Sequence, residues 1–256
     1  MPAQQLLKLQ TAVLTEIRSK ATFVERRRKG FNPVVDGKHL PAGPFEPTAP
    51  AISAHVPLMI GSNATEPTGL QPTVSAAALD DAALLASAKQ SLRVDDAAAQ
   101  RVIAAYKRVQ PGLSNRELSL RLAADTGMRA GVITEAERKA DQNKAPVYMY
   151  YLSWKTPVAG GKFVSPHTMD LPFVFDNLAA GREMVGTGKD QETLAERMSG
   201  AWTSFARTGK PFAKSLPEWR PFDAKNRATM IFDNECKCLN DPDREARLAV
   251  AAARQA

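Results

Sequence analysis

The chain has 256 residues, of which 44% are hydrophobic and 24% charged, and its formal net charge is +7. This composition is typical of a globular protein, and the length allows one large domain or two small ones. No apolar run approaches the roughly 20 residues that a membrane-spanning helix needs, so we expect no membrane span. Only two cysteines are present, Cys236 and Cys238, which excludes a disulfide scaffold and a cysteine zinc site.

The positive charge raises the question of nucleic-acid binding. The densest basic run is Arg26-Arg27-Arg28-Lys29, and the other basic residues alternate with Asp and Glu, as on solvated helix faces. No zinc-finger spacing or RNA-binding aromatic motif accompanies the charge, so we expect no nucleic-acid partner. The first twenty residues lack the order of a secretory signal peptide. The two cysteines fit a reducing, cytoplasmic compartment, but the localisation stays undetermined.

Strands separated by helices are predicted along the chain, which indicates an α/β fold with a mostly parallel sheet. Only three convincing strands are found, whereas a parallel sheet covered by this much helix usually has more strands. The sheet is therefore predicted to be incomplete. In chain order we predict a helix over 4–29, a proline-rich extended loop over 30–57, a strand from Leu58, helices over 75–140 with breaks at 110–112 and 125–127, a strand over 147–154, a Pro/Gly loop over 156–177, a helix over 190–208, a strand over 229–232 and a helix over 243–256.

Two side chains in loops after predicted strands are candidates for chemistry. His167 follows the strand over 147–154, and loops beyond strand ends are where α/β folds place reactive groups. Glu66 follows the strand from Leu58, and a carboxylate there could orient an imidazole. From spacing alone, a purely structural role stays open for both. His39 and His55 are interpreted as ordinary loop histidines, and the histidines are too scattered for a zinc site, so no metal or cofactor is expected.

Several segments, in order, resemble the C-terminal half of the type B carboxylesterases, the α/β-hydrolases that include para-nitrobenzyl esterases and cholinesterases. The match covers roughly residues 5–245, so residues 1–256 are interpreted as the C-terminal portion of one such domain, with a large helical block and an incomplete sheet. The segments are Phe31–Gly37 with Leu40-Pro41, Val56–Glu66, Ala145–Trp154, His167–Phe175 with its "H…LPFVF" pattern, and Trp202–Pro211 followed by Pro217–Trp219.

The resemblance implies roles for both candidates. Glu66 corresponds to the acid of a catalytic triad and His167 to its base. The histidine would take a proton from a serine hydroxyl that attacks a carboxylic ester and return it to the departing alcohol, while the glutamate holds the imidazole. The implied substrate is a small carboxylic ester, with no cofactor.

The chain departs from the family in the nucleophile. The G-x-S-x-G elbow is missing, because Gly61-Ser62-Asn63 lacks the spacing, and Gly160-Gly161 lies in the wrong region to be the oxyanion-hole glycines. Pro67 also stands where the family often has glycine or alanine. We therefore expect no nucleophile in this chain, an absent nucleophile-bearing N-terminal half, and an esterase fragment that is inactive alone.

Three interpretations remain open. The first is a split or truncated esterase that works with a separate N-terminal half. The second is a non-catalytic, cholinesterase-like binding module, against which the presence of both Glu66 and His167 argues. The third is a hydrolase with another nucleophile, for which Ser165 lies nearest to His167 in the sequence.

Overall fold

The computed structural model describes residues 1–20, 33–70 and 77–255, which fall into two units, Met1–Pro47 and Thr48–Ala256. In the first unit, α1 spans Ala3–Lys20, and Leu6, Leu7 and Leu9 on it are exposed. The predicted continuation of this helix to residue 29, with the basic run at 26–29, lies outside the described residues.

The rest of the first unit contains a turn built around Asp36. The Asp36 carboxylate accepts the backbone N–H groups of Lys38, His39 and Leu40 at 2.8–2.9 Å, and its second oxygen lies 2.9 Å from His39 Nδ1. These hydrogen bonds, that of the Leu40 N–H first, hold the pKa of Asp36 well below its ordinary value. His39 is thus part of a local turn, in agreement with its interpretation as an ordinary loop histidine.

The second unit is organised around a four-stranded sheet in the order β1-β2-β3-β4. The strands β1 (Leu58–Asn63), β2 (Val147–Leu152) and β3 (Ala228–Phe232) are parallel, while β4 (Lys237–Asn240) pairs antiparallel with β3. The first three correspond to the predicted strands. β4 was not predicted, because its four residues are short of apolar character and largely exposed.

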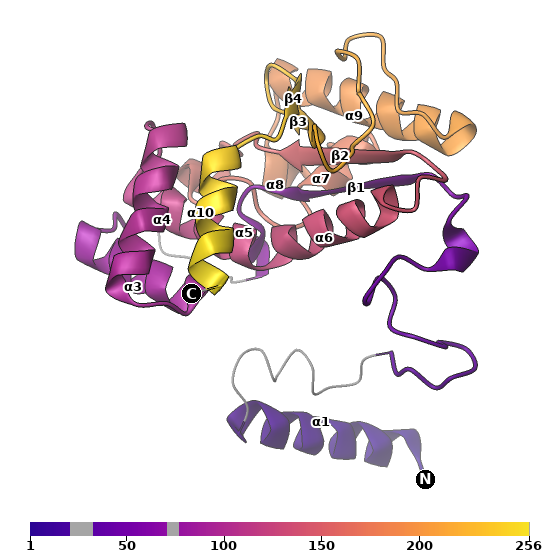
Figure 1. Cartoon of the computed structure of the whole chain (residues 1–256), viewed down its shortest axis with the longest axis vertical. Helices are drawn as coiled ribbons and strands as arrows, with labels where there is room; N and C mark the ends of the chain where they lie inside the picture. Colours follow the sequence, from indigo (N-terminus) through magenta and orange to yellow (C-terminus); the bar gives the residue numbers. More distant parts are fainter. Residues whose placement is uncertain (21–32, 71–76, 256) are drawn as a thin grey trace. The chain divides into compact units, whose positions relative to one another are not determined.

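Helices cover both faces of this sheet (Figure 1). The helix α6 (Met128–Ala140) packs on one face, and α9 (Lys189–Thr208) lies on the other with the short helices α7 (Asp170–Val174) and α8 (Arg182–Val185). Along β2, Tyr148 and Leu152 belong to the core on the α9 side, whereas Val147 and Met149 belong to the core on the α6 side. A strand buried on both faces explains why the sequence of β2 is apolar throughout.

A separate core joins the helices α3 (Asp81–Leu92), α4 (Asp96–Val109), α5 (Asn115–Thr126) and α10 (Arg244–Gln255), which lie together in Figure 1. The predicted breaks near 110–112 and 125–127 are confirmed, and Ser114 starts α5 with a capping box. A further break was missed between α3 and α4. Arg93 there has a left-handed φ of 62°, and the side chain of Asp95 accepts the Ala98 N–H to cap α4.

The predicted Pro/Gly loop after β2 contains the short helices η3 (Val158–Gly161) and α7. The proline at position 172 led to the prediction of a loop. It lies in the first turn of α7, where the backbone N–H makes no hydrogen bond within the helix, so a proline is tolerated there. Phe173 is fully buried, and its ring meets that of Trp154 edge-on with 5.3 Å between centroids. Aromatic packing therefore anchors this helix in the core directly after the histidine loop.

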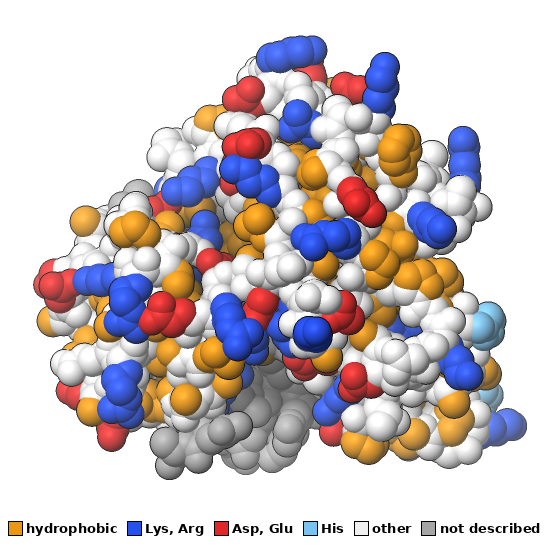
Figure 2. Space-filling view, turned by 45° about the horizontal axis from the view of Figure 1, so that its top comes forward, with side chains coloured by type: hydrophobic (Ala, Val, Ile, Leu, Met, Phe, Trp, Pro, Cys, Tyr) orange, Lys and Arg blue, Asp and Glu red, His pale blue; other side chains and the backbone are white. Residues whose placement is uncertain are grey.

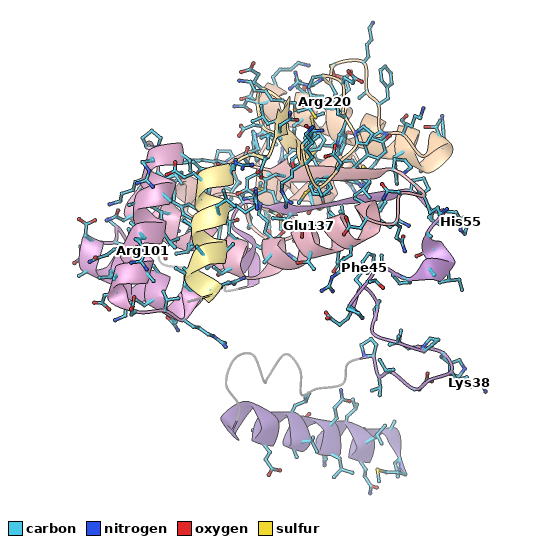
Figure 3. All side chains as sticks on the ribbon, viewed as in Figure 1. Lys38, Phe45, His55, Arg101, Glu137 and Arg220 are labelled. Carbon is cyan, nitrogen blue, oxygen red and sulfur yellow. The ribbon has the colours of Figure 1, made fainter. Side chains whose placement is uncertain are left out.

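A network of arginines around Asp241 joins the end of β4 to the helices. The Asp241 carboxylate, whose side chain is 9% exposed, lies 2.6 Å from an Arg247 nitrogen and 3.3 Å from nitrogens of Arg227 and Arg244. Arg227 also lies 2.6 Å from a carboxylate oxygen of Glu137, which Figure 3 labels on α6. The buried side chains of Asp241 and Arg227, together with more exposed partners, thus hold the start of α10 against the sheet and α6.

Acidic and basic side chains lie interspersed on the face shown in Figure 2. Surface pairs such as Lys107 with Asp81 and Lys189 with Glu192 contribute to this mixture. Within the described ranges, no helix has both the length and the apolar character to cross a membrane.

Candidate active site

Glu66 lies just beyond the carboxyl end of β1. The strand ends at Asn63. The next two residues, Ala64 and Thr65, are fully buried, and Glu66 begins the 3₁₀ helix η2 (Glu66–Leu70). The Glu66 side chain is only 7% exposed, and its Oε1 accepts the backbone N–H of Asn63 at 2.7 Å. The first turn after the strand therefore holds the carboxylate against the strand end.

His167 lies in the loop that follows β2. Ser165 and Pro166 before it are buried, while the His167 side chain itself is 33% exposed. Val164 and Thr168 on either side of it have left-handed φ values of 60° and 67°. Such backbone strain in branched residues is uncommon, and it clusters at functional sites.

The two predicted residues meet, although they are 101 positions apart in the chain. His167 Nδ1 lies 2.5 Å from Glu66 Oε2. Because an ionised carboxylate only accepts hydrogen bonds, a neutral imidazole in this position carries its proton on Nδ1 and has its lone pair on Nε2. The pair therefore has the geometry of an oriented general base, with the buried carboxylate behind an imidazole that is partly open to solvent.

Hydroxyl groups join the acid loop to the histidine loop. Thr65 N–H donates to the Ser165 carbonyl at 3.0 Å, and Ser165 N–H donates back to Thr65 Oγ1 at 2.8 Å. The hydroxyls of Thr65 and Thr68 both donate to the Phe163 carbonyl at 2.8 Å. The sequence did not point to these threonines, because their partners are about a hundred residues away.

Gly69 makes the close approach of the two loops possible. A Cβ at this position would lie 2.7 Å from the His167 backbone nitrogen and 2.8 Å from its Cβ and carbonyl oxygen. Real Cβ atoms do not come so close to a backbone, so η2 can lie against His167 only with glycine there. The sequence offered no signal for this contact.

We expect Gly69→Ala to lower the free energy of unfolding by about 1–3 kcal/mol, because the added methyl group forces η2 and the histidine loop apart. Urea denaturation measures this change. Gly112→Ala is the matched control, since a Cβ there would meet nothing within 4 Å, and it should stay within about 0.5 kcal/mol of the unmodified chain. Equal effects of the two substitutions would contradict the close-approach argument.

The structure contradicts the hypothesis that Ser165 is an alternative nucleophile. The residue is 0% exposed, and its hydroxyl donates to the Leu152 carbonyl at 2.9 Å, so it is occupied in holding the loop to β2. His55, labelled in Figure 3, precedes the amino end of β1 and is thus at the opposite end of that strand from Glu66. Among the described residues, no group of His, Cys, Asp or Glu side chains is arranged to hold a metal ion.

Tyr150 and Asp170 form a polar layer next to the pair. Tyr150 on β2 donates its hydroxyl to Asp170 Oδ2 at 3.0 Å. Burial, followed by the charge of Asp170 and its hydrogen bond, raises the pKa of Tyr150 far above its ordinary value, so the phenol stays protonated as a donor. Asp170 is the first residue of α7, three residues after His167. Its hydrogen bond with Tyr150 therefore ties the start of α7 to the sheet.

Comparison with known proteins identifies the family. The sequence model of the carboxylesterase family matches residues 1–250. The chain belongs to the carboxylesterase family. The resemblance seen in the sequence is thereby confirmed, and the mostly parallel open sheet with many helices is consistent with part of an α/β-hydrolase fold.

Individual members of the carboxylesterase family support the same assignment. A para-nitrobenzyl esterase of Bacillus subtilis (strain 168) is 28% identical over 221 residues, which are 85% of this chain and 42% of that protein. A phenmedipham hydrolase of Pseudarthrobacter oxydans is 28% identical over 214 residues, 80% of this chain and 41% of that protein. The chain thus spans less than half the length of these curated relatives.

Solved structures of carboxylesterases share the fold. A PNB esterase structure superimposes with a TM-score of 0.69 at 26% identity, covering 98% of this chain and 48% of the esterase. The carboxylesterase EST55 of Geobacillus stearothermophilus gives a TM-score of 0.65 at 26% identity, covering 96% of this chain and 54% of that enzyme.

Proposed function

We propose that this chain supplies the acid and the base of a carboxylic ester hydrolase, with Glu66 as the acid and His167 as the general base. The observation that supports this function is the 2.5 Å contact between His167 Nδ1 and Glu66 Oε2. The contact joins a buried carboxylate to a partly exposed imidazole at the carboxyl ends of two adjacent parallel strands. In α/β folds, reactive groups collect at this edge of the sheet.

The proposed chemistry is acyl transfer. His167 Nε2 accepts the proton of a serine hydroxyl while the serine oxygen bonds to the ester carbonyl carbon. The imidazolium then gives this proton to the alkoxide that leaves as an alcohol, and an acyl-serine remains. A water molecule, deprotonated by the same nitrogen, hydrolyses the acyl-serine, while Glu66 keeps the tautomer and stabilises the imidazolium.

The nucleophile in this proposal comes from a separate polypeptide segment, because the sequence of this chain contains no G-x-S-x-G elbow. Strand β1 is the place where such a segment would pair. Within the described structure, β1 has a neighbour on one side only. The N–H groups of Leu58 and of Ala64, the residue after the strand, donate to the carbonyls of Pro146 and Leu152 on the β2 side. Because successive N–H groups of a strand point to opposite sides, those of Met59 and Gly61 point away from β2. A further parallel strand that paired there would bring its carboxyl end beside His167.

A non-catalytic binding module is the alternative function. Binding a partner does not require a histidine oriented by a buried carboxylate, nor the threonine hydroxyls that hold the two loops together. Hydrolysis uses each of these features, so it explains the arrangement better.

Hydrolysis of para-nitrophenyl butyrate tests the proposal. We expect no turnover above buffer for the purified chain, and turnover when an esterase half that carries a G-x-S-x-G elbow is fused before it. The same fusion with the elbow serine replaced by alanine is the control and should be inactive. Turnover by the chain alone, or a folded but inactive fusion, would contradict the assignment.

A further inference from the structure

Asn63, the last residue of β1, contacts both loops of the candidate site. Its backbone N–H donates to Glu66 Oε1 at 2.7 Å. Its side-chain Nδ2 donates to the carbonyl of Pro166 at 2.7 Å, one residue before His167. A single residue, only 1% exposed, therefore bonds to the carboxylate of the acid and to the main chain that carries the base.

The orientation of the Asn63 amide follows from its neighbours. Besides the Pro166 carbonyl, Nδ2 faces Asp170 Oδ1 at 3.4 Å, and Tyr150 holds the other oxygen of Asp170. Because the Pro166 carbonyl and the Asp170 carboxylate are acceptors, the NH₂ group of Asn63 must point toward them. The Asn63 side chain therefore acts as a hydrogen-bond donor in this site.

The other end of the same amide is unpaired. Asn63 Oδ1 is buried and has no hydrogen-bond partner within the described structure. A buried acceptor without a partner is unfavourable for stability, so the stability of the fold does not by itself account for an asparagine here. The donor bonds to the histidine loop are what this residue adds to the site.

We infer that Asn63 is a positioning residue that sets the geometry between Glu66 and His167. Its backbone fixes where the carboxylate lies, its side chain fixes where the histidine loop begins, and both bonds leave from one residue at the end of one strand. The distance between Nδ1 and Oε2 then depends on Asn63, and so does the preference for the Nδ1–H tautomer of His167. The catalytic consequence of this inference rests on the proposed function, whereas the geometry is a property of the free chain.

Nitrogen NMR of the His167 ring in the full chain tests the inference without any ester hydrolysis. We expect the unmodified chain to show the Nδ1–H tautomer and a far-downfield Nδ1 proton. Both Asn63→Ala and Asn63→Val remove the amide donors, and the valine also fills the space of the side chain. In both variants we expect a mixture of the Nδ1–H and Nε2–H tautomers of His167. The Nδ1 proton should also exchange with water about fivefold faster, the factor that losing one typical hydrogen bond produces. Ser62→Ala, buried on the same strand with its side chain on the opposite face, should leave both signals unchanged.

Three results would overturn the inference. The first is an unchanged tautomer in both Asn63 variants, and the second is a change in Asn63→Ala that Asn63→Val restores, because space filling would then suffice. The third applies even if the variants fail to fold: Asn63 side-chain amide protons that exchange with water as fast as an exposed amide, in the unmodified chain, would show that the donor bonds do not form.

The same variants separate this inference from the proposed function. In an active fusion with an elbow-bearing half, we expect the Asn63 variants to lower kcat by about 10- to 100-fold with little change in KM, because the base is misplaced while the substrate pocket is intact. An inactive fusion with altered NMR signals would contradict the esterase proposal alone. An active fusion with unaltered NMR signals would contradict the Asn63 inference alone.

Discussion

His167→Asn is expected to lower kcat/KM for para-nitrophenyl butyrate by about 10⁴-fold or more in an esterase assembled from this chain and an elbow-bearing half. Asparagine can still hydrogen-bond to Glu66 Oε2, which lies 2.5 Å from Nδ1 in the unmodified chain. It cannot accept the serine proton at neutral pH, so the serine stays a weak nucleophile. Steady-state kinetics of the two fusions measure the effect.

His55→Asn is the matched control for this loss. His55 is exposed and precedes the amino end of β1, whereas Glu66 follows the carboxyl end, so this substitution should leave kcat/KM unchanged. A His167→Asn fusion that keeps most of its activity would mean that another group takes the serine proton. The assignment of His167 as the base would then be wrong.

Asp241→Asn is expected to lower the free energy of unfolding at pH 7 by about 1–3 kcal/mol, because it removes the charge from hydrogen bonds to partly buried guanidinium groups. The Asp241 carboxylate meets nitrogens of Arg227, Arg244 and Arg247, and its side chain is 9% exposed. Asparagine keeps the size of the side chain and tolerates the left-handed φ of 44° at this position. The charge is therefore the property that the substitution tests, and urea denaturation measures it.

The effect of Asp241 should depend on pH in a definite direction. Burial acts to raise the pKa of Asp241, but the hydrogen bond and charge of Arg247, with the charges of Arg227 and Arg244, outweigh it and lower the pKa below the ordinary 3.8. The stabilisation is therefore complete above pH 3.8 and is lost as the pH falls through the lowered value in the folded chain. The difference between Asp241→Asn and the unmodified chain should be constant from about pH 5 to 7 and shrink below pH 3.8.

Asp141→Asn serves as the control for the acid series, because Asp141 is exposed at the end of α6. We expect it to change the free energy of unfolding by no more than about 0.5 kcal/mol at pH 7. An Asp241→Asn effect that is equally small, or that persists undiminished at pH 3, would show that the arginine network does not stabilise the fold through this charge.

Local patterns in the sequence predicted most of the secondary structure. The apolar runs of β1, β2 and β3 and the helical spacing of α9 were found, because burial on a strand or helix face repeats at short range. What was missed depends on partners elsewhere. β4 is defined by pairing with β3, and α7 by packing of Phe173 on Trp154, neither of which appears in a local window.

The site was predictable only as two candidates. Their places after strand ends and the resemblance to type B carboxylesterases pointed to Glu66 and His167, but no local pattern could join residues 101 positions apart. Asn63 and Gly69 carried no sequence signal for their roles, since an asparagine at a strand end and a glycine in a loop are common. Their roles depend on distances to the histidine loop.

The sequence by itself determined most of the secondary structure elements, the two candidate residues and the absence of an elbow motif from this chain. Only the tertiary structure decided that Glu66 and His167 touch, that Ser165 is occupied, and that Asn63 bonds to both loops. The physical reason is the parallel pairing of β1 with β2. Parallel strands place their carboxyl ends at one edge of the sheet, so loops that are far apart in the chain meet there and exchange hydrogen bonds whose geometry the local sequence does not contain.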